Sequence, residues 1–269
     1  MQVFQISAAS FQYDGISAIR DLTLNISGGE RTVLLGANGS GKSTLLRMLD
    51  GLCFPSHGSI TAFGDPLTQH SLNNLEFNFN FRRRVGLVFQ NPDAQLFNST
   101  VFEEVAYSPL QLGWTREELH RRVEETLEFM GISHLRDRSP YRLSGGEKKR
   151  VAIASVIVLN PDVLLLDEPT ATLDPRSTSQ LVDLIQQWKG STKTVITATQ
   201  QLDIVEDIAD RVLILKEGSL LADGTPSQIL SNTQLLLTTN LIHAHRHTHG
   251  NVIHAHPHLH RHSHDEHEH

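Results

Sequence analysis

Cysteine, aromatic residues and long apolar runs are all scarce in this chain of 269 residues. The single cysteine, Cys53, excludes an intramolecular disulfide framework and a cysteine-ligated zinc finger, and it is typical of a reducing compartment. The longest apolar run, residues 151–159, is about half as long as the roughly 20 residues that a membrane-spanning helix needs. The first residues, MQVFQISAASF, lack the basic and apolar regions of a signal peptide. We therefore expect a protein of the cytoplasm.

Positive charge is scarce as well. The chain has 23 lysine and arginine residues against 30 aspartate and glutamate residues, a formal net charge of −7. A general nucleic-acid binder needs a basic field to neutralise phosphates, so we expect no nucleic-acid partner. The length suffices for one large domain or two modest ones with a buried core.

Short continuous apolar runs alternate with helical patterns before residue 241. Runs without polar alternation are typical of strands buried on both faces of a parallel sheet. They lie at residues 33–35, 85–89, 163–166, 194–197 and 212–215. Residues 3–13 and 22–26 are expected to form antiparallel strands joined at Asp14-Gly15. The sequence thus predicts an α/β fold with a doubly wound core and an antiparallel β-subdomain.

A glycine-rich loop follows the first of these runs. Residues 36–43 read GANGSGKS and fit the P-loop pattern G-x-x-x-x-G-K-[ST], between a predicted strand and a helical run at residues 43–50. Backbone N–H groups of such a loop surround phosphate oxygens, and the helix N-terminus favours the anion. Lys42 would reach the β- and γ-phosphates, and the Ser43 hydroxyl would bind Mg²⁺. The sequence therefore predicts a nucleoside triphosphate site. Its expected contacts are Gly36, Asn38, Gly39, Ser40, Gly41, Lys42, Ser43 and Thr44.

Residues 163–168, VLLLDE, predict a strand that ends in two adjacent carboxylates. Neighbouring residues of a strand point to opposite faces, so Asp167 would complete the Mg²⁺ shell while Glu168 faces the attacking water as general base. Without the phosphate loop, the pair would indicate only an acidic strand end in solvent. With the loop, it indicates hydrolysis of the nucleotide.

Residues 143–147, LSGGE, precede a predicted helix at residues 148–159. Ser144 and Glu147 fit the capping box, which by itself indicates only a well-capped helix. The Ser144 hydroxyl and the amides of Gly145 and Gly146 would also form an anion site at a helix N-terminus. Both interpretations remain open at this point.

Together these motifs resemble those of the ATP-binding subunits of ABC transporters, over about residues 2–232. LSGGE is similar to the signature motif of that family, whose fifth residue is usually glutamine. The resemblance implies that Gln90 is the Q-loop glutamine and a Mg²⁺ ligand, that Asp174 belongs to the D-loop, and that Tyr13 stacks on adenine. It also implies ATP and Mg²⁺ as cofactors, and a second ATP-binding subunit, expected to be another copy of this chain. In that pair, the signature of one subunit closes over the ATP of the other.

Two longer segments narrow the resemblance. FQNPDAQLF at residues 89–97 and LSGGEKKRVAIA at residues 143–154 look like the ATPases of energy-coupling-factor importers, notably the cobalt and nickel branch. This resemblance implies an integral membrane scaffold, on which the helical subdomain docks, and a membrane subunit that binds the substrate. We therefore expect a peripheral protein on the cytoplasmic face of the cell membrane.

We expect three parts in the chain. Residues 91–160 contain helical stretches and no convincing strand, which predicts a helical signature subdomain inserted into the core. The nucleotide-binding core would comprise residues 1–90 and 161–241. A break in composition near Leu241 sets off residues 242–269 as a histidine-rich, metal-binding tail.

One position departs from the family pattern. After the predicted strand TVITAT the family has a histidine that contacts the γ-phosphate, whereas this chain has Gln200. A glutamine amide donates a hydrogen bond but carries no charge. We expect Gln200 to act as a working catalytic substitute. The alternatives are a weak hydrolase paired with a more active subunit, and a tail histidine that folds back into the site.

Twelve of the 16 histidines lie in the tail, mostly in H-x-H spacing that presents imidazoles on one face of an extended chain. Imidazole is a ligand for nickel, cobalt, zinc and copper ions. The tail has little apolar content, so we expect no fixed fold without metal. Metal handling linked to transport is the preferred interpretation, against an affinity tag or adventitious binding. The candidate ligands are His243, His245, His247, His249, His254, His256, His258, His260, His262, His264, His267 and His269.

The sequence as a whole predicts the ATP-hydrolysing subunit of a transition-metal importer, with nickel or cobalt as the preferred cargo. One alternative is a subunit of a vitamin-type importer, whose tail buffers metal. Another is a nucleotide-gated metal sensor or store with low turnover. A soluble ABC-type ATPase of DNA repair or translation would carry a long coiled-coil insertion or two ATPase cores, and the chain has neither.

Overall fold

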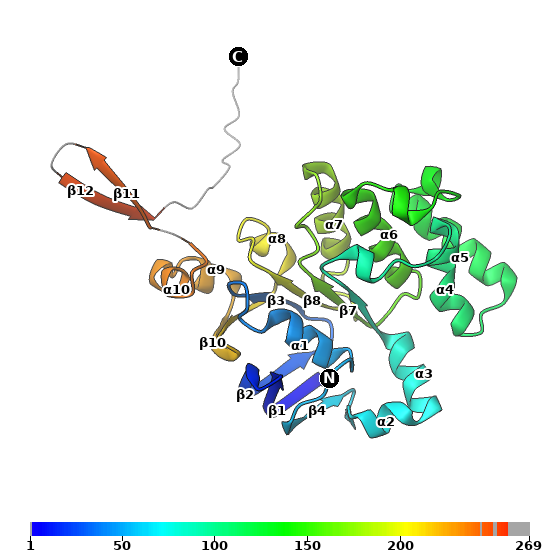
Figure 1. Ribbon diagram of the computed structural model, residues 1–269, viewed down its shortest axis with the longest axis horizontal. Helices are drawn as coiled ribbons and strands as arrows, with labels where there is room; N and C mark the ends of the chain where they lie inside the picture. Colours follow the sequence, from blue (N-terminus) through cyan, green and yellow to red (C-terminus); the bar gives the residue numbers. More distant parts are fainter. Residues whose placement is uncertain (1, 243, 250–251, 258–269) are drawn as a thin grey trace, which may run out of the picture.

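The computed structural model describes residues 2–242, 244–249 and 252–257 (Figure 1). Its centre is a six-stranded sheet with the order β10-β9-β3-β8-β7-β6. All neighbours are parallel except β10, which is antiparallel to β9. The strands are β3 (Arg31–Leu35), β6 (Val85–Val88), β7 (Val163–Asp167), β8 (Thr194–Thr199), β9 (Arg211–Lys216) and β10 (Ser219–Gly224). The predicted parallel core is confirmed.

A second, antiparallel sheet has the order β2-β1-β4-β5 and lies below the central sheet in Figure 1. Its strands are β1 (Gln2–Tyr13), β2 (Ile16–Ser27), β4 (His57–Ala62) and β5 (Asp65–Pro66). The predicted turn at Asp14-Gly15 is present, but β2 begins at Ile16 rather than at residue 22. The early part of β2 escaped prediction because its side chains are mostly exposed, which leaves no apolar run in the sequence.

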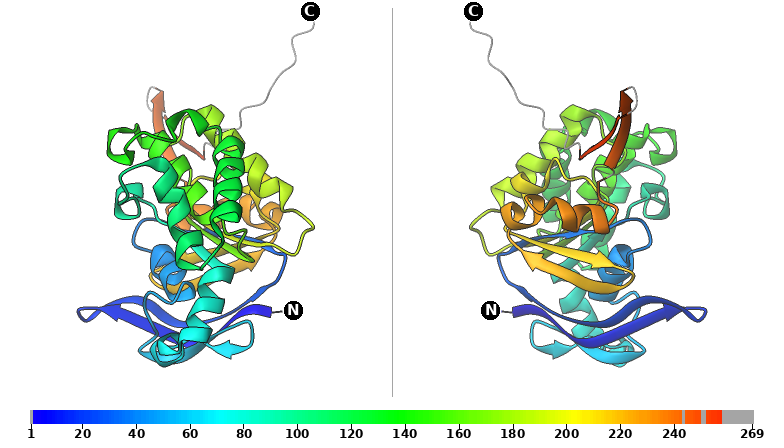
Figure 2. Two further views of the ribbon diagram at one scale, coloured as in Figure 1. Left: turned by 90° about the vertical axis from the view of Figure 1, so that its right-hand side faces the viewer. Right: turned by 90° about the vertical axis from the view of Figure 1, so that its left-hand side faces the viewer.

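Helix α1 (Lys42–Leu49) packs between the two sheets (Figure 1). The second face of the central sheet is covered by α6 (Gly145–Ile157), α7 (Pro175–Gln187) and α8 (Val205–Ile208). Figure 2 shows the same layers from both sides. Because both faces of the sheet are buried, its strands are continuous apolar runs rather than alternating ones. Short helices α9 (Pro226–Leu230) and α10 (Thr233–Thr238) follow β10.

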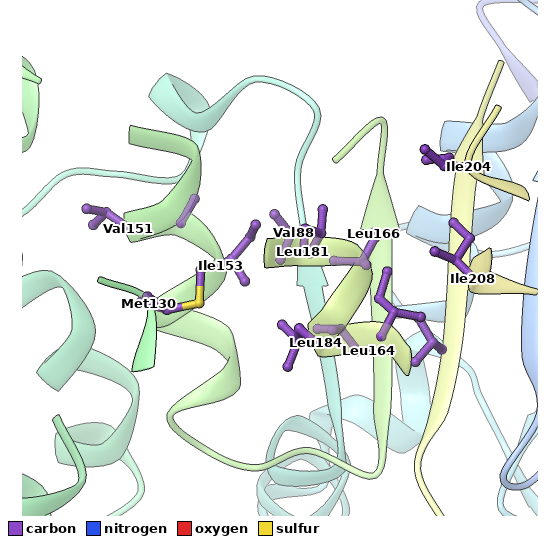
Figure 3. Packing of buried hydrophobic residues seen from close by; sticks show 14 of the residues in the cluster. Val88, Met130, Val151, Ile153, Leu164, Leu166, Leu181, Leu184, Ile204 and Ile208 are labelled. Carbon is purple, nitrogen blue, oxygen red and sulfur yellow. The ribbon is translucent and has the colours of Figure 1, made fainter. Parts of the chain in front are cut away.

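The helical part of the chain shares the core of the sheet. Helices α4 (Val101–Gln111) and α5 (Arg116–Phe129) precede α6, with short 3-10 turns at Pro92–Ala94, Ser133–Leu135 and Pro140–Arg142. Ile153 of α6 belongs to the same buried cluster as Val88 and Leu166 of the sheet (Figure 3). The helix that begins at Ser144 is therefore fixed to the strands that carry Gln90 and Asp167.

Two helices between β5 and β6 were not predicted. They are α2 (Gln69–Asn73) and α3 (Leu75–Arg84). The pattern FNFNF at residues 77–81 alternates with period two, which is typical of a strand, and only Phe81 of α3 is buried. The Asn74 side chain accepts a hydrogen bond from the amide of Phe77 and starts α3 as a helix.

The expectation that the tail has no fixed fold is wrong for two segments. Strands β11 (Ala244–His249) and β12 (Val252–Pro257) form an antiparallel pair. Thr248, Val252 and Ile253 are β-branched residues, which favour an extended backbone. The remaining candidate ligands, His243, His258, His260, His262, His264, His267 and His269, lie outside the described residues. In the described part of the chain, every helix is too short or too polar to span a membrane.

Candidate nucleotide site

The phosphate loop connects β3 to α1, and its glycines are required by close backbone contacts. A side chain at Gly36 would overlap the Ser40 hydroxyl and the carbonyl of Leu215. At Gly41, φ is 105° and a Cβ atom would lie 2.6 Å from the carbonyl oxygen of Ala18. The loop therefore holds its backbone in the tight turn that phosphate binding needs, directly before the N-terminus of α1.

Lys42 is almost completely buried at the start of α1. Its Nζ donates to the carbonyl oxygens of Gly36 at 2.6 Å and Ala37 at 3.3 Å. It also lies 3.8 Å from Oε1 of Glu168. Burial lowers the pKa of Lys42, and the negative charges of Glu168 and Asp167 oppose this effect. The ammonium thus lies between the phosphate loop and the carboxylate expected to act as base.

Ser43 and Asp167 bring together two oxygen ligands from segments far apart in the sequence. The Ser43 hydroxyl donates to Oδ1 of Asp167 at 2.9 Å. Burial raises the pKa of Asp167, whereas the Ser43 hydrogen bond and the nearby Lys149 lower it. A hydroxyl and a carboxylate side by side are the hard oxygen ligands that Mg²⁺ prefers.

Glu168 follows β7 with a φ of 41°, and this turn gives its carboxylate partners that differ from those of Asp167. Oε2 accepts a hydrogen bond from the Thr199 hydroxyl at 3.2 Å. Burial raises the pKa of Glu168, opposed mainly by Lys42 and also by the Thr199 hydroxyl and the Gln200 amide. A carboxylate with a raised pKa is a stronger base at neutral pH.

Unpaired buried atoms indicate where a ligand fits. Among the described side chains, Ser40 Oγ and Glu168 Oε1 are buried without a hydrogen-bond partner, and a third such atom, Nε of Arg150, lies elsewhere. Buried polar atoms are nearly always paired, so the first two indicate a missing polar partner at this site. A cleft of about 310 Å³ opens here, and its walls include Glu168 and residues 38–44, but not Gly36. The donors and acceptors present fit a nucleotide with its Mg²⁺.

A larger cavity of about 900 Å³ lies at the opposite ends of the strands, beside α3. Two of its basic groups, Arg84 and Lys193, already have partners. Arg84 pairs with Asp162 at 2.8 Å and lies over the ring of Phe63, and Lys193 donates to the carbonyl oxygens of Asn160 and Pro161. No residue of the phosphate loop lines this cavity, so we place the nucleotide in the smaller cleft.

Tyr13 and Gln90 line the same cleft as the phosphate loop. Tyr13 ends β1, is partly exposed, and packs edge-on against Phe11. Gln90 follows β6 and is exposed. The structure therefore brings together the phosphate loop, Tyr13, Gln90 and Glu168, with Asp167 bound to Ser43.

The signature residues and Asp174 form a separate cluster that does not line this cleft. A Cβ atom on Gly146 would lie 3.9 Å from the Asp174 carboxylate, and one on Gly145 would be 4.0 Å from Thr172. The capping box is present, because Ser144 and Glu147 exchange hydrogen bonds between side chain and backbone. Asp174 caps α7 through the Ser177 amide and hydroxyl, which lower its pKa.

Gln200 follows β8 with an exposed side chain, and it does not line the cleft. The neighbouring Gln201 is fixed instead: its Oε1 accepts a hydrogen bond from the Thr170 hydroxyl at 2.5 Å, and its amide donates to Thr199 Oγ1 at 3.1 Å. Sequence reasoning missed these contacts of Gln201, because its partners lie on other segments.

Sequence reasoning also missed Lys149, a completely buried lysine of α6. Burial lowers its pKa to about 8, against the attraction of Asp167 and Glu168. A signal was available, because Lys149 precedes Ala152 and Ile153 by three and four residues and so lies on the apolar face of the helix. Within residues 2–242, no group of three or more histidine, cysteine or acidic residues could hold a metal ion.

Comparison with known proteins gives consistent matches. The family model described as "ABC transporter" matches residues 19–171. The nickel import ATP-binding protein NikO of Rhodobacter capsulatus is 48% identical over 242 residues, covering 89% of this chain and 95% of that protein.

Solved structures of ABC transporter proteins have a similar fold. The structure of cbiO1 from Clostridium perfringens, part of the ABC transporter complex cbiONQ, has a TM-score of 0.74 and 36% identity, covering 89% of this chain and 95% of that chain. The ATP-binding cassette MJ0796, in a dimeric post-hydrolysis state bound to ADP and Pi, has a TM-score of 0.75 and 26% identity, covering 83% of this chain and 98% of that chain.

Proposed function

This chain belongs to the ABC transporter family as the ATP-hydrolysing subunit of an importer, and on that premise we propose that it powers the import of nickel or cobalt ions. The family resemblance and the ABC ATPase fold expected from the sequence are confirmed. Two observations support a metal cargo: the 48% identity to a nickel import protein, and the histidine-rich tail. In this proposal the chain binds the cytoplasmic face of the membrane, through an integral scaffold protein and a substrate-binding membrane subunit.

Nucleotide binding is assigned to the residues that converge at the cleft. The amides of the phosphate loop would hold the phosphates, and Tyr13 would stack on adenine. Lys42 would exchange its carbonyl partners on Gly36 and Ala37 for the β- and γ-phosphates. Ser43, Asp167 and Gln90 would hold Mg²⁺, which supplies positive charge against the phosphates.

Hydrolysis is assigned to Glu168. Oε2 of its buried carboxylate accepts a hydrogen bond from Thr199, whereas Oε1 has no hydrogen bond and lies 3.8 Å from Lys42 Nζ, so Oε1 is available to accept a proton from water. The ion pair with Lys42 stabilises the negative charge of this carboxylate. The unpaired Oε1 of Glu168, beside the phosphate loop, is the observation that carries this assignment. Gln200 would orient the water or the γ-phosphate through its amide.

Completion of the site is assigned to a second copy of the chain. Ser144, Gly145, Gly146 and Asp174 lie together but outside the cleft of their own subunit. The exposed N-terminus of α6 provides amides for the phosphates of a nucleotide held by a partner. A related cassette forms a dimer with bound ADP and Pi, which supports a pair of this kind.

Uptake of radiolabelled Ni²⁺ and Co²⁺ tests the cargo. Cells that lack this chain would be complemented with the wild type, with Glu168→Gln, or with the control Glu206→Gln on the exposed surface of α8. We expect the wild type and Glu206→Gln to restore uptake of one of these metals and Glu168→Gln to fail. Unchanged metal uptake in cells without the chain would contradict the proposal and favour a vitamin-type importer.

A further inference from the structure

Lys149 lies in the second turn of α6, the helix that begins after Ser144, and it is completely buried. Its Nζ donates to three backbone carbonyl oxygens, those of Phe89 at 2.8 Å, Gln90 at 3.1 Å and Asp167 at 3.3 Å. An ammonium group has three N–H donors and no acceptor. These carbonyls therefore satisfy all of its hydrogen-bonding capacity, which a buried charge requires.

The three carbonyls come from the ends of two neighbouring strands. Phe89 and Gln90 follow β6, and Asp167 ends β7, which pairs with β6 in parallel. Both strand ends carry a residue assigned to Mg²⁺, namely Gln90 and Asp167. The backbone of each is thus bound to one ammonium group, which belongs to neither strand.

A second contact fixes the other end of the Q-loop segment, residues 89–95, to the same helix. Gln95 accepts a hydrogen bond from the Phe89 amide at 3.1 Å and donates to the Ala152 carbonyl at 2.8 Å and the Ser155 hydroxyl at 3.0 Å. At the surface, Lys148 pairs with Asp93 at 2.6 Å. The Q-loop segment is therefore attached to α6 at both of its ends.

We propose that Lys149 is a positioning residue for ATP hydrolysis, which holds the backbone of Gln90 and Asp167 at a fixed place relative to the helix that presents Ser144. In a dimer, α6 carries the signature toward the nucleotide of the partner, while Lys149 holds the Mg²⁺ ligands of its own subunit. Movement of the signature helix therefore moves Gln90 with it. This inference depends on the hydrolysis assigned above and does not depend on the transported ion.

Lys193 provides a matched control for a purely structural lysine. Its Nζ also donates to two backbone carbonyls, those of Asn160 at 2.7 Å and Pro161 at 2.8 Å, and lies near a carboxylate of Asp162 at 3.8 Å. These residues lie at the opposite ends of the strands from the cleft. Loss of the lysine head group removes similar bonds in both places, but only Lys149 contacts segments of the nucleotide site.

The test compares Lys149→Met with Lys193→Met in the full-length chain, at a temperature below the melting of both variants. Three quantities are measured: ATP affinity without Mg²⁺, ATP affinity with Mg²⁺, and kcat. We expect Lys149→Met to bind ATP without Mg²⁺ within about twofold of the wild type. Its kcat, and the factor by which Mg²⁺ raises its ATP affinity, should each fall about tenfold, which is the size expected for a lost charge-assisted hydrogen bond. Lys193→Met should leave all three within about twofold.

A double variant separates positioning from general stability. If Lys149 acts by placing Gln90, Lys149→Met should lower kcat little further when Gln90→Ala is already present, because residues that act as a unit are not additive.

Lys149→Arg, which keeps the charge and the donors, should recover part of the lost activity and serves as the test if Lys149→Met does not fold. Equal effects of the two Met variants, or full additivity with Gln90→Ala, would overturn the proposal. The affinity gain from Mg²⁺ gives a readout even if turnover is low, so failure of the hydrolysis assignment would be seen separately.

Discussion

Gln200 occupies the position after β8 at which the family has a histidine, and its backbone amide helps to hold Glu168 in the ionised form. The adjacent Gln201 is bonded to Thr170 and Thr199, so it is fixed between β7 and β8 and is less free to reach a nucleotide. The uncharged amide of Gln200 would have to contact the γ-phosphate in place of the imidazole of the family.

Gln200→Ala should lower turnover by roughly tenfold while ATP binding survives, since one hydrogen bond to the reacting groups is lost. The measurement is phosphate release at saturating ATP, together with ATP affinity. Gln186→Ala, on the exposed surface of α7, is the control and should retain wild-type turnover. Unchanged turnover in Gln200→Ala would show that this side chain has no catalytic part.

At the scale of helices and strands, the buried carboxylate of Asp50 connects α1 to α3. Asp50, at the C-terminus of α1, accepts a hydrogen bond from Arg82 of α3 at 3.0 Å. Burial raises the pKa of Asp50 to about 7 although Arg82 opposes the shift. Since the folded chain holds this proton more tightly than the unfolded chain does, stability falls as pH rises from about 4 to 7 and then levels off.

Asp50→Asn should therefore raise stability at both pH values but more at pH 8 than at pH 5, with a difference of roughly 2–3 kcal/mol or about 5–10 °C in Tm. Thermal melts of the variant and the wild type at both pH values are the measurement. The control is Asp137→Asn, whose carboxylate is 80% exposed and should show no such pH dependence. A variant that is destabilised equally at pH 5 and pH 8 would contradict the account of Asp50.

The elements also show what the sequence could predict. The strands of the central sheet were predictable because burial on both faces makes them continuous apolar runs, as at residues 163–166. Helix α3 was not, because the alternation FNFNF resembles a strand and the cap at Asn74 alone starts the helix. The β11–β12 pair was not predicted either, since histidine carries little intrinsic preference for strands.

The residues of the site also fall into those that the sequence predicts and those that it does not. Lys42, Ser43, Asp167 and Glu168 belong to local motifs whose residue order implies their chemistry, and the structure brings them together. Lys149 acts through carbonyl groups, which every residue has, so no sequence pattern marks its partners.

At the largest scale, we propose that the histidine-rich tail links ATP hydrolysis to metal. In the β11–β12 pair His245 lies opposite His256, and His247 lies opposite His254. Residues directly opposite in an antiparallel pair occupy the same face of the sheet, and alternate residues of each strand share that face. We propose these four histidines as the tightest ligands of the tail, because imidazole is a donor suited to Ni²⁺, Co²⁺ or Zn²⁺.

Replacement of His245, His247, His254 and His256 by alanine should remove the tightest Ni²⁺ binding of the full-length chain, measured by isothermal titration. The control replaces His258, His260, His262 and His264, which are equal in number and also have H-x-H spacing but lie outside the described residues. We expect the first set to lose at least tenfold more affinity, and binding in the wild type to weaken below pH 6.5 as imidazoles become protonated. Equal losses in both sets would indicate binding by the composition of the tail alone.

In the proposed mechanism Glu168 is the base, and the signature of a second copy of the chain completes the site. The most direct measurement is the molar mass of Glu168→Gln in solution with ATP and Mg²⁺, by light scattering, together with phosphate release. We expect an ATP-dependent dimer and a fall in turnover of about 100-fold or more. Addition of Ser144→Arg should abolish the dimer, although each monomer still binds ATP. Wild-type turnover in Glu168→Gln, or a dimer that forms regardless of Ser144, would contradict this mechanism.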